Sequence, residues 1–147
     1  FSFEYLKDDK PWQIKADLAF PCATQNELTD DDAKALADGG CRWIVEGANM
    51  PCTDGAVRVA RAEDIVICPG KAANAGGVAV SAFEMSQNAA FQRWSRETVH
   101  ERLRETMKDI HKSCVIQLDA EGRPDYITAA NRAGFLRVAD ALVAQGC

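Results

Sequence analysis

Three short apolar runs constrain the fold of this chain more than any other feature. They occupy residues 17–20, 43–46 and 65–68 and begin at intervals of about two dozen residues. Runs of this length are typical of buried strands, and the spacing leaves room for a helix between each pair. Alternation of strand and helix is typical of a parallel sheet. The sequence therefore predicts an α/β fold with three parallel strands.

The segments between these runs carry signals for helix starts and ends. Thr29 is a suitable N-cap, the acidic residues 30–32 follow it, and Gly39 and Gly40 can end the helix. The second connection, at residues 53–62, is short and predicts a short helix. Each strand is therefore expected to reach the next through a helix that covers the sheet.

From about residue 76 onward the pattern predicts three helices and no further strand. Ser95 is a suitable N-cap for the middle helix. Residues 122–125 predict a turn, and the last helix is expected to begin near Ile127. We expect residues 119–124 to be a loop inside one domain. The apolar residues of the middle helix repeat at helical spacing and form one stripe: Val99, Leu103, Met107, Ile110 and Cys114.

Each apolar run leads into a small polar turn that contains an asparagine. These asparagines are Asn26, Asn49 and Asn74. Ligands of open parallel sheets bind outside the carboxyl ends of the strands, so the three amides are expected to share one rim. An amide both donates and accepts hydrogen bonds, which suits a ribose hydroxyl or a carboxamide. The alternative is that asparagine and glycine only form the turns.

The third turn opens a helix whose first face carries a mixed set of side chains. Asn74, Val78, Ser81 and Met85 follow one another at spacings of four, three and four residues. Such a face suits a small molecule with an aliphatic body and a polar end. The alternative is a helix buried against the sheet, with the Ser81 hydroxyl bonded to its own backbone.

Composition and missing motifs exclude several function classes. A net charge of −5 and a pI near 5.0 argue against a nucleic-acid partner, and no apolar run reaches membrane-spanning length. The sequence contains no phosphate-binding glycine motif and no assembled acid–base set. His100 and His111 are too isolated to predict a metal site, and the six cysteines form no C-x-x-C pair. We therefore expect free, mostly buried thiols in a reducing compartment.

The three turns resemble consecutive motifs of glutamate dehydrogenases, most of all the NADP-type small hexameric enzymes. Residues 21–28 read Pro-Cys-Ala-Thr-Gln-Asn-Glu-Leu, residues 46–51 read Glu-Gly-Ala-Asn-Met-Pro, and residues 69–77 continue the likeness. The resemblance covers nearly the whole chain. It implies a partial Rossmann-like parallel sheet followed by three C-terminal helices. On this basis residues 1–147 are the C-terminal part of the dinucleotide-binding domain of a longer enzyme.

The resemblance also implies an activity and its partners. The longer enzyme would interconvert L-glutamate and 2-oxoglutarate plus ammonia by hydride transfer with NADP, or with NAD. Its catalytic lysines would lie upstream, in an N-terminal substrate domain, and it would be a cytoplasmic homo-hexamer. The first residue is Phe1 rather than methionine, which also predicts a processed chain or a piece of a longer one.

Specific residues take on roles by the same resemblance. Cofactor contacts near the ribose and pyrophosphate would come from Ala23, Thr24, Gln25 and Asn49, and Asn74 would hold the nicotinamide end. Val78 and Ser81 would face the substrate, with the Ser81 hydroxyl reaching the side-chain carboxylate of glutamate. No catalytic and no metal-binding residue is expected in this chain.

The sequence departs from the family pattern at a few positions. Cys52 stands where threonine is usual, residues 53–64 match poorly, and Ala82 replaces a common glycine. Two alternatives therefore remain open. One is another amino-acid dehydrogenase of the same superfamily, in which an apolar residue replaces Ser81. The other is a non-catalytic module for nucleotide binding or assembly.

Overall fold

The computed structural model describes residue 7 and residues 9–115, 118–119 and 122–146. Strands and helices alternate as far as β3, and only helices follow it. In chain order the elements are η1 (Pro11–Gln13), β1 (Leu18–Ala19), α1 (Asp30–Asp38), β2 (Trp43–Val45), α2 (Asp54–Ala62), β3 (Val66–Cys68), α3 (Gly70–Ala73), α4 (Ala75–Ala89), α5 (Arg96–Val115) and α6 (Tyr126–Ala144). The predicted α/β fold is confirmed.

The three strands form one parallel sheet in the order β1-β2-β3. Ile44, in the central strand, lies opposite Ala19 on one side and Ile67 on the other. Within the described residues, β1 pairs with a strand on one side only. Leu18 and the neighbouring Phe20 are exposed there. The prediction of three parallel strands is therefore confirmed, and among the described residues β1 lies at an edge of the sheet.

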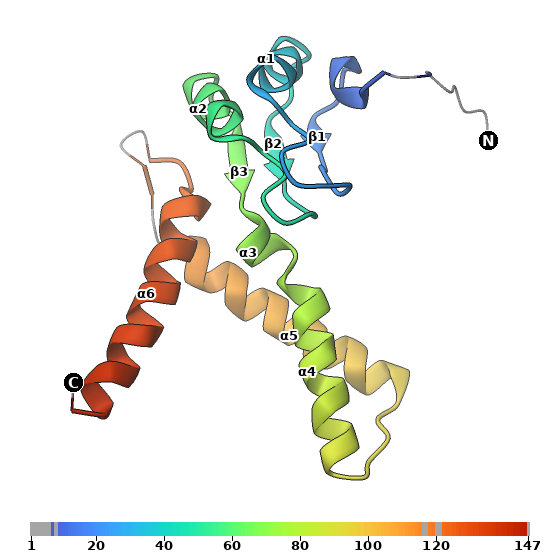
Figure 1. Ribbon diagram of the computed structural model, residues 1–147, viewed down its shortest axis with the longest axis vertical. Helices are drawn as coiled ribbons and strands as arrows, with labels where there is room; N and C mark the ends of the chain where they lie inside the picture. The colour runs from blue at the N-terminus through green and yellow to red at the C-terminus, as the bar shows by residue number, and fades with distance from the viewer. Residues whose placement is uncertain (1–6, 8, 116–117, 120–121, 147) are drawn as a thin grey trace.

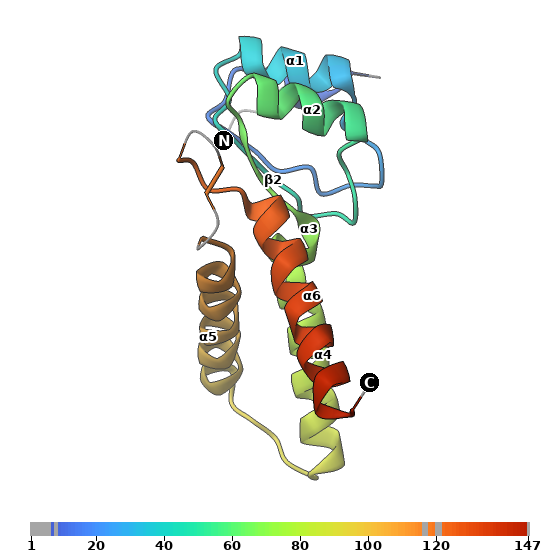
Figure 2. The same ribbon diagram turned by 90° about the vertical axis from the view of Figure 1, so that its left-hand side faces the viewer.

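The two faces of the sheet have different coverings. Ile44 and Ile67 point toward α1 and α2, which lie together on one side of the sheet (Figure 2). Trp43 and Val66 point the opposite way and pack with Cys114 of α5 and Tyr126 of α6. This alternation follows from the two-residue period of a strand.

Helix α1 begins and ends at the residues that the sequence indicates. The Asp32 carboxylate accepts hydrogen bonds from the Thr29 N–H at 2.8 Å and from the Thr29 hydroxyl at 2.7 Å. Burial alone would raise the pKa of Asp32, but these bonds and the ion pair with Lys10 at 2.6 Å lower it overall. Gly39 follows the last helical residue, and Gly40 has a φ of 84°, which glycine adopts freely.

Two short elements, η1 and α3, were not expected from the sequence. Each spans a single turn, which is too short to show a hydrophobic period. In α3, the Asn74 N–H donates to the Gly70 carbonyl at 2.9 Å. Helix α4 follows at once and begins at Ala75, one residue before the expected start.

The last three helices extend away from the sheet (Figure 1). The predicted stripe of α5 is confirmed, because its members are buried or half-buried while Arg104, Lys108 and Lys112 are exposed. Helices α4 and α6 instead expose large apolar side chains, namely Val78, Met85, Phe135, Val138 and Val143. In the described part of the chain, no helix combines the length and apolarity needed to cross a membrane.

Candidate functional site

The side-chain amide of Asn74 joins the second and third turns. Its Nδ2 donates to the carbonyl of Gly47 at 3.3 Å, to the carbonyl of Ala48 at 3.2 Å and to Oδ1 of Asn49 at 3.0 Å. Asn74 itself is half-buried and Asn49 is exposed. The amide therefore fixes the third turn against the second at the carboxyl ends of the strands.

Backbone hydrogen bonds join the first turn to the second. The Pro21 carbonyl accepts from the N–H groups of Gly47 and Ala48, both at 3.0 Å. Asn26, which has a φ of 56°, donates its N–H to the Met50 carbonyl at 3.0 Å. A side chain at position 47 would collide with Cys22, since a Cβ there would lie 2.3 Å from the Cys22 sulfur.

The three asparagines therefore lie along one rim, as the sequence predicts. Asn49 and Asn74 are in direct contact, and Asn26 is bonded to Met50, the residue that follows Asn49. Asn26 and Asn49 are exposed, so the rim faces solvent. A surface with amides that both donate and accept can orient a polar ring or a sugar hydroxyl.

The first turn presents its side chains to solvent but not its N–H groups. Ala23, Thr24 and Gln25 are exposed. The Glu27 carboxylate accepts from the Ala23 N–H at 2.8 Å and from the Thr24 N–H at 3.4 Å. A ligand phosphate would have to displace Glu27 to use these two donors. Glu27 follows Ala23 by four residues, a spacing that allows this contact but does not by itself predict it.

Helix α4 carries the candidate substrate face into solvent. The Val78 side chain is 71% exposed, and α4 has no buried residue. The alternative of a helix buried against the sheet is therefore wrong for α4. The Ser81 hydroxyl does donate to the Gly77 carbonyl of its own helix at 3.3 Å, as that alternative expected.

Glu46, at the end of β2, lies behind the rim and was not expected to act there. Its carboxylate is buried and accepts from the Gly70 N–H at 2.7 Å. Glu46 follows Ile44 by two residues, and this period places both side chains on the same face of the strand. That alternation was the sequence signal for a buried carboxylate.

Cys52 stands at a position where the resemblance described above implies threonine. Its side chain is buried against Glu46. Burial, followed by the Glu46 charge and a hydrogen bond to it, raises the pKa of the Cys52 thiol well above its usual range. Burial also raises the pKa of Cys68 to about 11. Both groups are therefore neutral thiols at physiological pH, and Cys52 does not contact a ligand on the rim.

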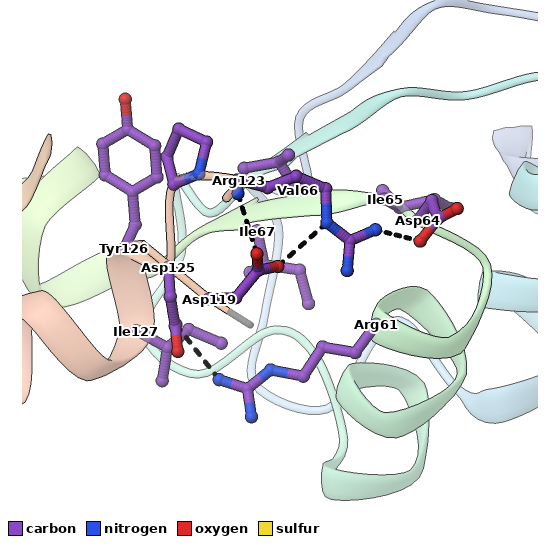
Figure 3. A pocket seen from close by; sticks show the side chains of 11 residues that line it. Arg61, Asp64, Ile65, Val66, Ile67, Asp119, Arg123, Asp125, Tyr126 and Ile127 are labelled. Atoms are coloured by element: carbon purple, nitrogen blue, oxygen red, sulfur yellow. Dashed lines mark hydrogen bonds and ion pairs between the residues drawn. The ribbon is translucent and has the colours of Figure 1, made fainter. Parts of the chain in front are cut away.

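A second, polar cleft of about 300 Å³ lies where β3 begins, beside the loop between α5 and α6 (Figure 3). Ion pairs cross it, from Arg61 to Asp125 at 3.2 Å and from Arg123 to both Asp64 and Asp119. Asp125 also caps α6 through Thr128. These contacts hold α6 against α2 and β3. Among the described residues, those of this cleft included, no group of three His, Cys, Asp or Glu side chains could hold a metal ion.

The Asp125 interactions predict a pH-dependent stability. Burial alone would raise the pKa of Asp125, but the Thr128 hydrogen bonds and Arg61 outweigh it and lower the pKa. A lowered folded-state pKa adds stability above the unfolded pKa of about 3.9, and this stability is lost as the pH falls through the folded value. Asp125→Asn keeps a capping residue but removes the charge. We expect the free energy of unfolding of the wild type to exceed that of Asp125→Asn by about 0.5–1 kcal/mol above about pH 5. The difference should shrink as the pH falls through the lowered folded-state pKa of Asp125.

Urea denaturation of both proteins across this pH range measures the gap. Asp109→Asn is the matched control, because Asp109 forms an ion pair with Lys112 in which both side chains are largely exposed. A gap between wild type and Asp125→Asn that stays constant with pH would contradict the assignment.

A family model described as glutamate/leucine/phenylalanine/valine dehydrogenase matches residues 1–146. The NADP-specific glutamate dehydrogenase of Psychrobacter sp. (strain TAD1) is 54% identical over 151 residues, which cover 99% of this chain and 34% of the relative. The NADP-specific glutamate dehydrogenase of Escherichia coli (strain K12) is 47% identical over 146 residues, which cover 99% of this chain and 33% of the relative. The chain thus spans about a third of the length of these curated relatives.

A solved structure agrees with the sequence matches. The crystal structure of Plasmodium falciparum glutamate dehydrogenase superposes with a TM-score of 0.92 and 47% sequence identity. The match covers 98% of this chain and 31% of that protein. The sheet and the three projecting helices therefore have a close counterpart within a longer chain.

Proposed function

Because the chain belongs to the glutamate/leucine/phenylalanine/valine dehydrogenase family, we propose that it is part of an enzyme that interconverts L-glutamate and 2-oxoglutarate plus ammonia with NADP. The observation that carries this proposal is the Asn74 amide, bonded to Ala48 and Asn49 on the rim of the sheet. The relatives named NADP-specific glutamate dehydrogenase support the choice of cofactor, and NAD remains an alternative.

The rim fits the nicotinamide end of such a cofactor. The Asn49 amide is exposed beside Asn74, and the small side chains of Ala23 and Ala48 allow a flat ring to approach the backbone. Asn74 would orient the ring, while Asn49 and the exposed Thr24 and Gln25 would contact the adjoining ribose and pyrophosphate. When bound, the cofactor supplies or accepts the hydride. The residues of this chain orient it and bring the substrate face of α4 beside it.

Ser81 and Val78 would bind the substrate from the first turns of α4. The Ser81 hydroxyl donates to the Gly77 carbonyl, which the helix ladder already satisfies. It can therefore turn toward a carboxylate without leaving that carbonyl unpaired. Val78, three residues earlier, would contact the aliphatic part of the amino acid. A hydroxyl at this place favours glutamate over leucine, because it can donate a hydrogen bond to the side-chain carboxylate, which leucine lacks.

The remaining part of the longer protein would supply the substrate domain and its catalytic lysines. The exposed apolar side chains on α4 and α6 support the presence of such a domain, because the surfaces of monomeric proteins rarely expose so many apolar side chains together. Phe135 and Val143 of α6 are 71% and 75% exposed. We propose that this domain packs beside the projecting helices, and that the whole protein assembles as a homo-hexamer.

Substrate kinetics of the full-length protein test this function. We expect it to reduce NADP with L-glutamate at least about tenfold more efficiently than with L-leucine, and we expect no turnover by the 147-residue chain. Ser81→Val should lower kcat/KM for glutamate by roughly tenfold to a hundredfold, because a hydrogen bond to a charged group contributes about 1.5–3 kcal/mol. The kcat/KM of Ser81→Val for leucine should equal or exceed that of the wild type.

Ser86→Val is the matched control for this substitution. Ser86 is also exposed on α4, and its hydroxyl also donates to its own helix, at 2.9 Å from the Ala82 carbonyl. It lies on a different face from Ser81, so its kinetics should remain close to wild type. A wild-type enzyme that prefers leucine would support the alternative of another amino-acid dehydrogenase. Turnover of glutamate by the 147-residue chain would contradict the proposal that the catalytic lysines lie outside it.

A further inference from the structure

Among the described residues, Glu46 is the one charged residue that is buried, with 8% of its surface exposed. Its backbone connects it to β3, and its side chain connects it to α3. The Glu46 N–H donates to the Cys68 carbonyl at 3.0 Å, and the carboxylate accepts from the Gly70 N–H at 2.7 Å. Burying a carboxylate is unfavourable unless it is well paired. The position therefore requires an explanation beyond filling the core.

The Gly70 N–H is the first donor of the short helix α3. The first amides of a helix have no partner inside it, and Pro69, the N-cap, makes no side-chain bond to them. The Glu46 carboxylate supplies this partner from the neighbouring strand. Asn74 is the C-cap of the same turn. The Glu46 side chain thus fixes the start of α3, and Asn74, whose amide lies on the rim, is at the end of α3.

The spacing around Gly70 leaves no room for α3 to shift toward the second turn. A Cβ at position 70 would lie 2.8 Å from the Ala48 carbonyl oxygen and 3.2 Å from the Asn74 amide nitrogen. That carbonyl is also an acceptor for the Asn74 amide. The Glu46 carboxylate, the α3 backbone and the Asn74 amide are therefore one connected set of contacts.

We propose that Glu46 is a positioning residue that sets the place of the Asn74 amide on the rim. The inference rests on the proposed function, in which Asn74 holds the nicotinamide end of the cofactor. Glu46 acts through the Gly70 N–H and α3 and touches neither cofactor nor substrate. Its loss should therefore weaken binding of the nicotinamide half of the cofactor and leave the adenine half unaffected.

Equilibrium binding to the full-length protein separates these two halves. The probes are NADPH and adenosine 2′,5′-bisphosphate, which lacks the nicotinamide. For Glu46→Ala we expect about a tenfold higher Kd for NADPH and an unchanged Kd for the bisphosphate. Glu46→Gln keeps an oxygen acceptor at the same distance, so its Kd for NADPH should stay within about threefold of wild type. Asn74→Ala is the reference variant, and its Kd for NADPH should equal that of Glu46→Ala.

Glu46→Asp keeps the charge but withdraws the carboxylate from Gly70, so it tests the geometry even if Glu46→Ala does not fold. It should bind NADPH more weakly than Glu46→Gln does. The reverse order, or an equal loss of affinity for both probes, would overturn the inference. If Asn74→Ala weakens NADPH binding and no Glu46 variant does, the inference fails and the proposed function stands. If Asn74→Ala has no effect, the assignment of the rim itself is wrong.

Discussion

In the full-length protein, Gly70→Ala is expected to lower kcat/KM for the cofactor by roughly tenfold to a hundredfold. The added Cβ would lie 2.8 Å from the Ala48 carbonyl oxygen, a backbone atom that cannot rotate away. The third turn must then move from the second, and the Asn74 amide moves with it. A displacement of about 1 Å at a binding site can reduce the rate by about a hundredfold.

Steady-state kinetics with NADPH varied would measure this effect, and Gly134→Ala provides the control. Gly134 lies in α6, where an added Cβ meets no described atom within 4 Å. Its kinetics should equal those of wild type, since alanine also favours a helix over glycine. Kinetics of Gly70→Ala close to wild type would show that the second and third turns need not touch for cofactor binding.

A large loss of stability is expected from a substitution in the hydrophobic core. Ile44→Ala should lower the free energy of unfolding of the 147-residue chain by about 2–5 kcal/mol, because it leaves a cavity in the central strand. Ile44 is 0% exposed and packs between the sheet and the helices α1 and α2. Loss of this side chain removes apolar contacts on the face of β2 that α1 and α2 cover.

Urea denaturation followed by circular dichroism would give this free energy. Val138→Ala is the control, because Val138 of α6 is exposed and its truncation should change stability by less than about 0.5 kcal/mol. An Ile44→Ala variant within about 1 kcal/mol of wild type would contradict the packing of the central strand.

The repeating patterns of the sequence were enough to predict the sheet. The three short apolar runs correspond to β1, β2 and β3, and the caps expected at Thr29 and Ser95 correspond to observed hydrogen bonds. The convergence of Asn49 and Asn74 followed from the parallel topology alone. These features are local or are fixed by strand order, so one sequence is sufficient to infer them.

Contacts between distant segments were not accessible in this way. The hydrogen bond from the Gly70 N–H to Glu46, for example, depends on how the turns are positioned in space. Helix α3 has only one turn and gives no periodic signal. The exposed apolar residues of α6 form a helical pattern that a sequence cannot distinguish from a buried one.

The position of β1 at the border of the sheet has a practical consequence. One side of its backbone pairs with no strand among the described residues, and Leu18 and Phe20 stand exposed beside it. Unprotected borders of this kind recruit strands from other molecules and lead to aggregation. The 147-residue chain should therefore be studied at low protein concentration, where self-association is slow.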